Sequence, residues 1–114
     1  MKQLGTLQIR IMRFIWNECD AVTVETVQEG LNAEPKAPEL AYTTVGTVMS
    51  NLVKAGFLAS KKGRSGPKYI FAALLTEEAY LKSQLKQIKN TFFDGDEHDL
   101  CNFIHTTLGK GDHA

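Results

Sequence analysis

Residues 40–72 read LAYTTVGTVMSNLVKAGFLASKKGRSGPKYIFA. Apolar residues in the first half recur at spacings of three and four, which predicts a helix from about Thr43 to Ala55. Phe57 to Lys61 and Lys68 to Ala72 contain residues that favour strands, and the six residues between them include two glycines and a proline. A helix followed by a β-hairpin is therefore the expected structure here.

Two further helices are expected before this stretch. Apolar residues at helical spacing predict one from about residue 4 to 18, and Thr23 is placed to cap another from Val24 to about Leu31. A short extended piece precedes Thr23, and the two prolines within residues 33–38 predict a turn before the next helix. The order helix, short strand, helix, helix, hairpin is that of a winged helix-turn-helix, mainly α with a small β-hairpin wing, over residues 1–75.

Residues 76–114 are predicted to form a helical dimerisation region. Thr76 and the two acidic residues after it are typical of a helix start, Asp94-Gly95-Asp96 ends that helix, and a last helix is expected from Asp99 to Leu108. Two short helices with apolar stripes favour packing against a second copy, although they could instead fold back onto their own domain. The residues predicted to form the homodimer contact are Tyr80, Leu81, Leu85, Ile88, Phe92, Leu100, Phe103, Ile104 and Leu108.

Size and composition limit the function. At 114 residues, the chain is too short for a large enzyme core with a cofactor domain, and no catalytic motif is recognisable, so we expect no enzyme and no cofactor. Its apolar runs are shorter than a membrane span, and its start lacks the apolar stretch of a signal peptide, which predicts a cytoplasmic chain without membrane contact. Cys19 and Cys101 are expected to be free thiols.

The net charge of zero conceals an uneven distribution. Residues 1–74 carry nine Lys or Arg and six Asp or Glu, whereas residues 75–114 carry four and seven. Between Leu40 and Leu75 there are five basic residues and no acidic one. This segment presents no repulsion to a polyanion, which favours nucleic-acid binding, and a solvated basic face is the alternative.

In a helix-turn-helix, the second of the paired helices enters the major groove of double-stranded DNA, and here it begins at Thr43. Threonine hydroxyls suit phosphate or base contacts and threonine methyls suit thymine, whereas the alternative is that Thr43 caps the helix and its neighbours are solvated. Gly46 costs about 1 kcal/mol relative to alanine in a helix, and close approach to DNA would explain it. The candidate DNA contacts are Thr43, Thr44, Thr47, Ser50, Asn51, Lys54, Lys61, Lys62, Arg64 and Lys68.

Three segments together, residues 4–16, 40–48 and 52–58, resemble the penicillinase repressor family, also called BlaI/MecI/CopY. The resemblance covers about residues 4–75 and is carried most strongly by Ala-Tyr-Thr-Thr-Val and the later Gly-Phe-Leu. It implies a bacterial homodimer that binds a palindromic promoter operator and represses transcription.

The resemblance also implies a recognition helix over residues 43–55 and a wing over residues 57–72. Asn51 stands where members commonly have Arg, and Ala55 stands where many have Lys. The wing is also longer, because it contains Ser65-Gly66-Pro67. Operator sequence is therefore not transferable from the family.

The sequence leaves two release mechanisms and one rival function open. The resemblance implies cleavage by a regulatory protease at Asn102-Phe103, which would divide a bivalent dimer into weak half-site binders. His98, Cys101 and His105 share one side of the last helix and are ligands that suit Zn or Cu(I), whereas the alternative is surface histidines beside a semi-buried thiol. Copper-responsive members carry Cys-x-Cys pairs, which this chain lacks. The rival function is a winged-helix protein-interaction module without DNA binding.

Overall fold

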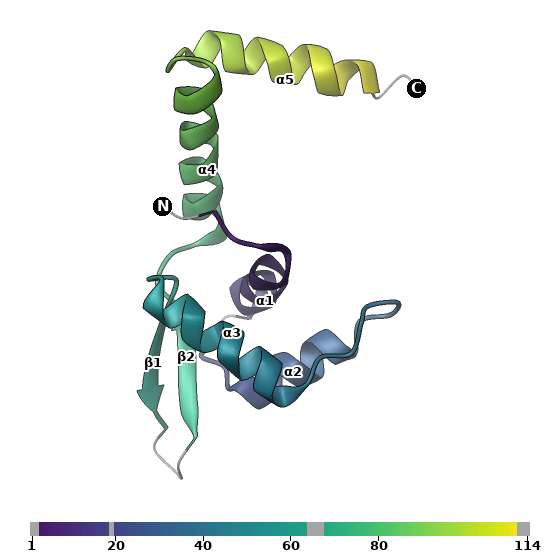
Figure 1. Ribbon diagram of the computed structural model, residues 1–114, viewed down its shortest axis with the longest axis vertical. Helices are drawn as coiled ribbons and strands as arrows, with labels where there is room; N and C mark the ends of the chain where they lie inside the picture. The colour runs from purple at the N-terminus through teal and green to yellow at the C-terminus, as the bar shows by residue number, and fades with distance from the viewer. Residues whose placement is uncertain (1–2, 19, 64–67, 112–114) are drawn as a thin grey trace. The chain divides into compact units, whose positions relative to one another are not determined.

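The computed structural model describes residues 3–18, 20–63 and 68–111. The chain forms two compact units, one that ends at Glu77 and one that begins at Glu78. Among the described residues, every helix is too short or too polar to cross a membrane. The elements, labelled in Figure 1, are α1 (Thr6–Asn17), α2 (Val24–Asn32), α3 (Tyr42–Lys54), β1 (Leu58–Lys62), β2 (Tyr69–Ala73), α4 (Glu77–Phe92) and α5 (Glu97–Gly111).

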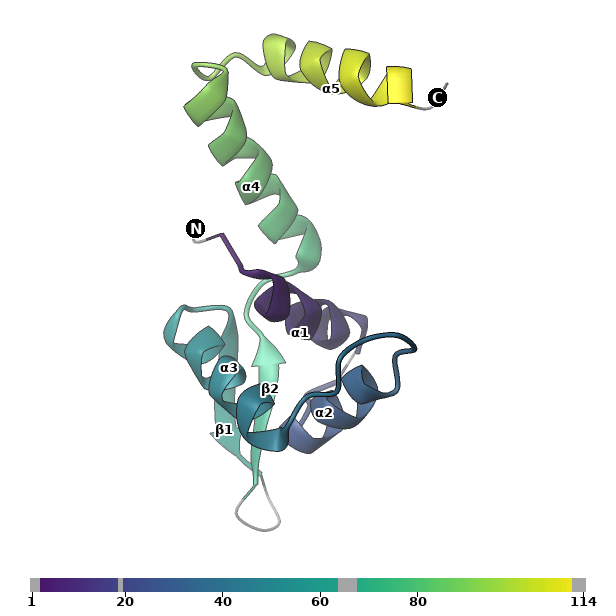
Figure 2. The ribbon, with the colours of Figure 1, turned by 45° about the vertical axis from the view of Figure 1, so that its right-hand side comes forward.

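The N-terminal unit is built around one core that α1, α2, α3 and the hairpin share. Helix α1 contacts α2, α3 and β2, and α3 also packs against α2 and β1. In Figures 1 and 2 the connection between α2 and α3 extends outward as a loop, as its two prolines predict. The helical spacing of the sequence is confirmed, because the fully buried side chains include Ile11, Met12, Val27, Leu31, Val45, Met49, Leu52, Phe57 and Leu58.

Helix α2 begins where the sequence predicts and packs closely on α1. The Thr23 hydroxyl accepts a hydrogen bond from the Thr26 amide at 3.1 Å, which satisfies an amide that the helix leaves without a helical partner. On the other side, a Cβ at Gly30 would overlap the ring of Phe14. Glycine at this position allows the two helices to approach each other.

Helix α3 ends at a glycine whose backbone conformation suits the turn into the wing. Gly56 has a φ of 88°, and the amide of Phe57 donates to the carbonyl of Leu52 at 2.9 Å. A positive φ of this size is favourable for glycine and strained for residues with a Cβ. The helix that the sequence predicts to end at about Ala55 ends at Lys54, directly before this turn.

The wing is an antiparallel pair of strands with one extra bridge. Leu58 pairs with Ala73 at one end, Lys62 pairs with Tyr69 at the other, and Val22 exchanges two backbone hydrogen bonds with Phe71 at 2.8 and 2.9 Å. This bridge ties the predicted short extended piece to β2. Residues 64–67, which include the predicted DNA contact Arg64, lie outside the described part of the chain.

Two side chains of α1 hold the segment that follows the wing. The indole Nε1 of Trp16 donates to the carbonyl of Leu75 at 2.9 Å, and Arg13 Nε lies 3.4 Å from Glu77 Oε2. The end of the N-terminal unit is therefore fixed against α1.

In the C-terminal unit, the last helix is longer than the sequence predicts. Asp94 and Gly95 have positive φ and end α4, and then the Asp96 carboxylate accepts from the Asp99 amide at 3.1 Å. Because Asp96 is the cap, α5 begins at Glu97 and not at Asp99, and it continues to Gly111. Phe93 and Phe103 pack with their ring centroids 5.7 Å apart, so the turn between the two helices has its own apolar contact.

Candidate nucleic-acid interface

One side of α3 is buried and the opposite side is polar and open. Val45, Met49 and Leu52 face the core, and they recur at helical spacing. The residues that follow the same spacing on the other side are exposed: Thr43, Thr47, Ser50, Asn51 and Lys54. Because the buried apolar residues and the exposed polar residues lie on different sides of α3, the helix carries short polar side chains and still contributes to the hydrophobic core.

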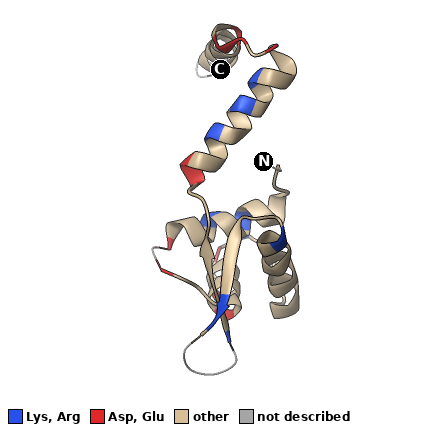
Figure 3. Ribbon diagram, turned by 90° about the vertical axis from the view of Figure 1, so that its left-hand side faces the viewer, with Lys and Arg blue, Asp and Glu red and all other residues tan. Residues whose placement is uncertain are grey.

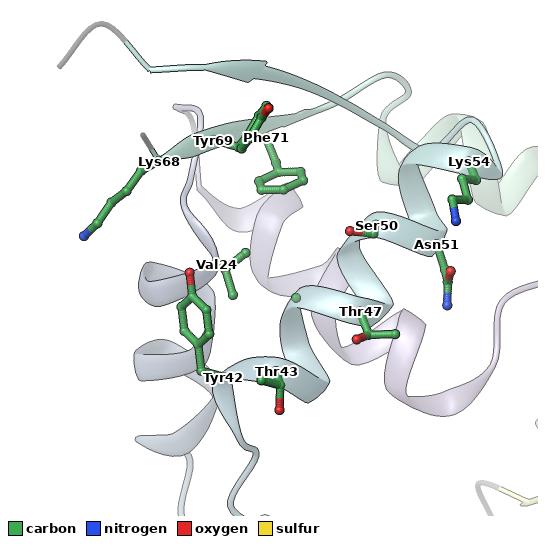
Figure 4. A pocket seen from close by; sticks show the side chains of 11 residues that line it. Val24, Tyr42, Thr43, Thr47, Ser50, Asn51, Lys54, Lys68, Tyr69 and Phe71 are labelled. Carbon is green, nitrogen blue, oxygen red and sulfur yellow. The ribbon is translucent and has the colours of Figure 1, made fainter. Parts of the chain in front are cut away.

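This polar side of α3 forms one wall of a groove whose other wall is the start of β2 (Figure 4). The floor contains Val24, Gly46 and Phe71, and the ring of Phe71 points into the groove. The side chains along the α3 wall are uncharged except for Lys54 at its far end. The walls are lined by Tyr42, Thr43, Thr47, Ser50, Asn51, Lys54, Lys68 and Tyr69.

Six of the ten predicted DNA contacts line this groove, and the structure places three of the others elsewhere. Thr44 is exposed but lies outside the lining, and the same holds for Lys61 and Lys62. The strand register explains part of this separation, because successive side chains in a strand point to opposite faces. Ser60 and Lys62 pair with Phe71 and Tyr69, whereas Lys61 pairs with Ile70.

Lys61 therefore belongs to the hairpin face opposite that of Phe71, and Lys62 shares the face of Phe71. The two lysines are adjacent in the sequence, yet they belong to opposite faces of the hairpin. Figure 3 shows the basic residues of the wing at the far ends of β1 and β2. A wing of this kind presents positive charge to both of its sides.

The sequence segment without acidic residues does not form a surface without acidic residues. Lys68 Nζ lies 2.6 Å from Oε2 of Glu25, which belongs to the first turn of α2. The hydrogen bond from Lys68, followed by the lysine's charge, lowers the pKa of Glu25, and the same hydrogen bond raises the pKa of Lys68. The segment itself contributes no carboxylate, but folding brings one to Lys68 from 43 residues away, so the composition of the segment does not describe the charge around this lysine.

Two aromatic side chains at the groove were missed by the sequence reasoning. Tyr42 is 52% exposed and Tyr69 is 56% exposed, and both line the walls. In Figure 4 the Tyr42 hydroxyl points toward the start of β2. Their positions in the sequence could have indicated them, because Tyr42 directly precedes two predicted DNA contacts, Thr43 and Thr44, and Tyr69 directly follows a third, Lys68.

The predicted dimer residues divide into exposed and buried groups. Tyr80 and Leu100 are 6% and 8% exposed within the single chain. The rest remain open to solvent: Leu81, Leu85, Ile88 and Phe92 on α4, and Phe103, Ile104 and Leu108 on α5. The four α4 side chains recur at spacings of four and three, so they form one stripe along the helix.

The candidate metal ligands do not form a coordination site. His98, Cys101 and His105 are all exposed on α5, and His98 Nε2 lies 3.4 Å from the Asn102 amide nitrogen. Across the described ranges, no group of three His, Cys, Asp or Glu side chains is arranged to hold a metal ion. Cys101 is a free, exposed thiol and not the semi-buried one that the alternative interpretation expected, and Cys19 lies outside the described residues.

Comparison with solved structures supports the fold. A chain described as "Structure of GAS PerR-Zn-Zn" superposes with a TM-score of 0.54 at 15% identity, over 63% of this chain and 45% of that one. At this identity the likeness concerns the fold alone. The observed order of helices and hairpin is a winged helix-turn-helix.

Sequence comparison identifies the family. The "Transcriptional regulator BlaI" proteins of Mycobacterium tuberculosis strains CDC 1551 / Oshkosh and ATCC 25618 / H37Rv are each 32% identical to this chain over 69 residues. That alignment covers 60% of this chain and about half of the relatives, 48%. The model of the family described as "Penicillinase repressor" matches residues 4–112, which include both units. The chain therefore belongs to the penicillinase repressor family.

Proposed function

We propose that this protein is a sequence-specific DNA-binding transcriptional repressor that acts as a homodimer on a palindromic promoter operator. The observation that carries the proposal is the groove between α3 and β2, whose walls present Thr43, Thr47, Ser50, Asn51 and Lys54 together on one side of a single helix. Major-groove recognition uses a helix with such a row of short polar side chains, flanked by groups that contact phosphates.

The roles of these side chains differ by chemistry. Asn51 can donate to and accept from the adenine edge, and the methyl groups of Thr43 and Thr47 can pack on thymine methyls. Lys54 and Lys68 stand near opposite ends of the groove and would contact phosphates. Membership in the penicillinase repressor family and the winged-helix fold support this assignment.

The second unit is proposed to supply the dimer contact. Leu81, Leu85, Ile88 and Phe92 leave an apolar stripe open on α4, and three more apolar side chains are open on α5. A symmetric dimer would cover the same stripe on both copies. Two joined DNA-binding units can then occupy half-sites one helical turn apart, and each unit raises the effective concentration of the other.

The operator experiment is fluorescence-anisotropy titration with duplexes that tile the region upstream of the gene, each at several salt concentrations and with excess nonspecific DNA. We expect one near-palindromic duplex to bind two protomers saturably, with a steep loss of affinity as salt rises. Flat titrations on every duplex, at low salt as well, would instead favour a protein-interaction module.

A matched pair of variants tests the groove. Asn51→Ala should weaken binding to the identified operator by about 1–3 kcal/mol through the loss of a base contact. The control is Asn90→Ala, which makes the same substitution at an exposed position of α4 outside the groove. Equal affinities for the two variants would contradict the assignment of α3 as the recognition helix.

The proposed release step is cleavage of the Asn102-Phe103 bond by a regulatory protease, as the family resemblance implies. Both side chains are exposed, but their carbonyls accept hydrogen bonds from the Thr106 hydroxyl at 2.9 and 3.3 Å inside α5. A protease would have to unwind this part of α5 before cutting it. A variant with both residues replaced that still leaves its operator upon induction would overturn the proposal.

A further inference from the structure

Lys68 combines two properties. It lines the proposed DNA groove beside Tyr69, and its ammonium group is already occupied by a carboxylate. The Nζ to Oε2 distance of 2.6 Å is that of a charge-assisted hydrogen bond, and both side chains are open to solvent, 63% for Lys68 and 49% for Glu25. A phosphate that reaches Lys68 therefore meets the negative charge of Glu25 at the same place.

The side chains around Lys68 add to the negative charge that a phosphate would meet there. Besides Glu25, the negative charge of Glu29, which lies one helical turn beyond Glu25 on α2, also raises the pKa of Lys68. Both carboxylates favour the charged lysine and compete for it with an incoming anion. In contrast, the ion pairs formed among the described residues involve neither Lys61 nor Lys62 on β1.

We propose that Glu25 is a negative determinant of DNA affinity: it holds Lys68 in an ion pair at the groove in the free protein and withholds that charge from DNA. The inference rests on the proposed function. While this ion pair is formed, Lys68 does not contribute its charge to a phosphate contact, and the pair itself is worth little to the stability of the protein because both side chains are exposed. The loss of affinity would apply to nonspecific duplexes at every position, because they are bound through phosphates and lack matching base contacts.

The test compares Glu25→Gln with Glu29→Gln in the full chain. Both substitutions remove one negative charge from the same helix, and only the first releases Lys68. The probe is a duplex of arbitrary sequence, about 30 base pairs long, which accommodates two half-sites a helical turn apart. Anisotropy titrations at several salt concentrations give both the affinity and the slope of log K against log salt.

We expect Glu25→Gln to tighten binding about twofold to fivefold, the range that corresponds to an exposed ion pair. The slope should steepen by about 0.9 per protomer, because one more lysine becomes available for a phosphate. Glu29→Gln should produce a smaller gain in affinity. In a Lys68→Gln background, Glu25→Gln should leave the slope unchanged, because no lysine remains to be released.

Two outcomes overturn the inference and leave the proposed function intact. Equal effects of Glu25→Gln and Glu29→Gln would show that only total charge matters, and weaker binding of Glu25→Gln would show that Glu25 positions Lys68 for its phosphate. The wild-type titration tests the proposed function separately. If the wild-type protein binds no duplex even at low salt, the proposed function fails and this inference falls with it.

Discussion

Two helical glycines have opposite expected effects when they are replaced by alanine, and Gly46 is the more informative of them. A Cβ at Gly46 would lie 3.8 Å from Val24 Cγ1, which is an ordinary van der Waals contact. The fold therefore does not require glycine at this position. Since alanine is the better helix former, Gly46→Ala should raise the free energy of unfolding by about 0.5–1 kcal/mol and Tm by about 2–8 °C.

The same methyl group would stand on the floor of the groove, between the walls that carry Thr47 and Tyr69. It would keep a DNA backbone or base edge from approaching α3 closely. If one good contact is lost, operator binding weakens by about 1–3 kcal/mol, which is a fivefold to 150-fold higher Kd. Gly46→Ala is thus expected to make the protein more stable and less able to bind DNA.

Gly30→Ala is the matched control, because a Cβ there would overlap the Phe14 ring. That substitution should lower the free energy of unfolding by about 1–3 kcal/mol through overpacking. Chemical denaturation followed by circular dichroism measures both variants, and anisotropy with the operator duplex measures binding. A Gly46→Ala variant that is destabilised like Gly30→Ala, or that binds the operator as tightly as the wild type, would contradict these expectations.

Three other predictions address the ion pair, the dimer and the last helix. Because the pKa of Glu25 is below its ordinary 4.5 and that of Lys68 is above its ordinary 10.5, the pair's contribution to stability should be complete between these values. The difference in unfolding free energy between wild type and Lys68→Met should shrink as pH falls through the lowered pKa of Glu25. It should also shrink as pH rises through the raised pKa of Lys68, and a difference that stays constant at both extremes contradicts this prediction. Leu85→Lys, which places a charge in the exposed stripe of α4, should convert a dimer into a monomer in analytical ultracentrifugation, and an unchanged sedimentation coefficient would rule out this stripe as the contact. Asp96→Ala should lower the stability of the C-terminal unit by about 1 kcal/mol and reduce its helix signal in thermal melts, because the Asp96 carboxylate caps α5, and a melt identical to that of the wild type would contradict this.

Local features of the sequence were sufficient for most of the secondary structure. The buried side of α3, the Thr23 cap and the end of α3 each depend on residues within a few positions of one another, so spacing and residue type predict them. The start of α5 was misplaced for a local reason as well. Asp94-Gly95-Asp96 was interpreted as a break only, whereas its last residue also caps the next helix.

Only the tertiary structure decided how the wing and α3 form one groove. Whether Lys61 or Lys62 shares the face of Phe71 depends on strand register, which a shift of one residue would reverse. The pairing of Lys68 with Glu25 depends on packing that brings α2 beside the start of β2, and no periodicity links residues so far apart in the chain. The sequence by itself determined which helix would present polar side chains, because that pattern is local, and long-range packing determined which charges those side chains would have as neighbours.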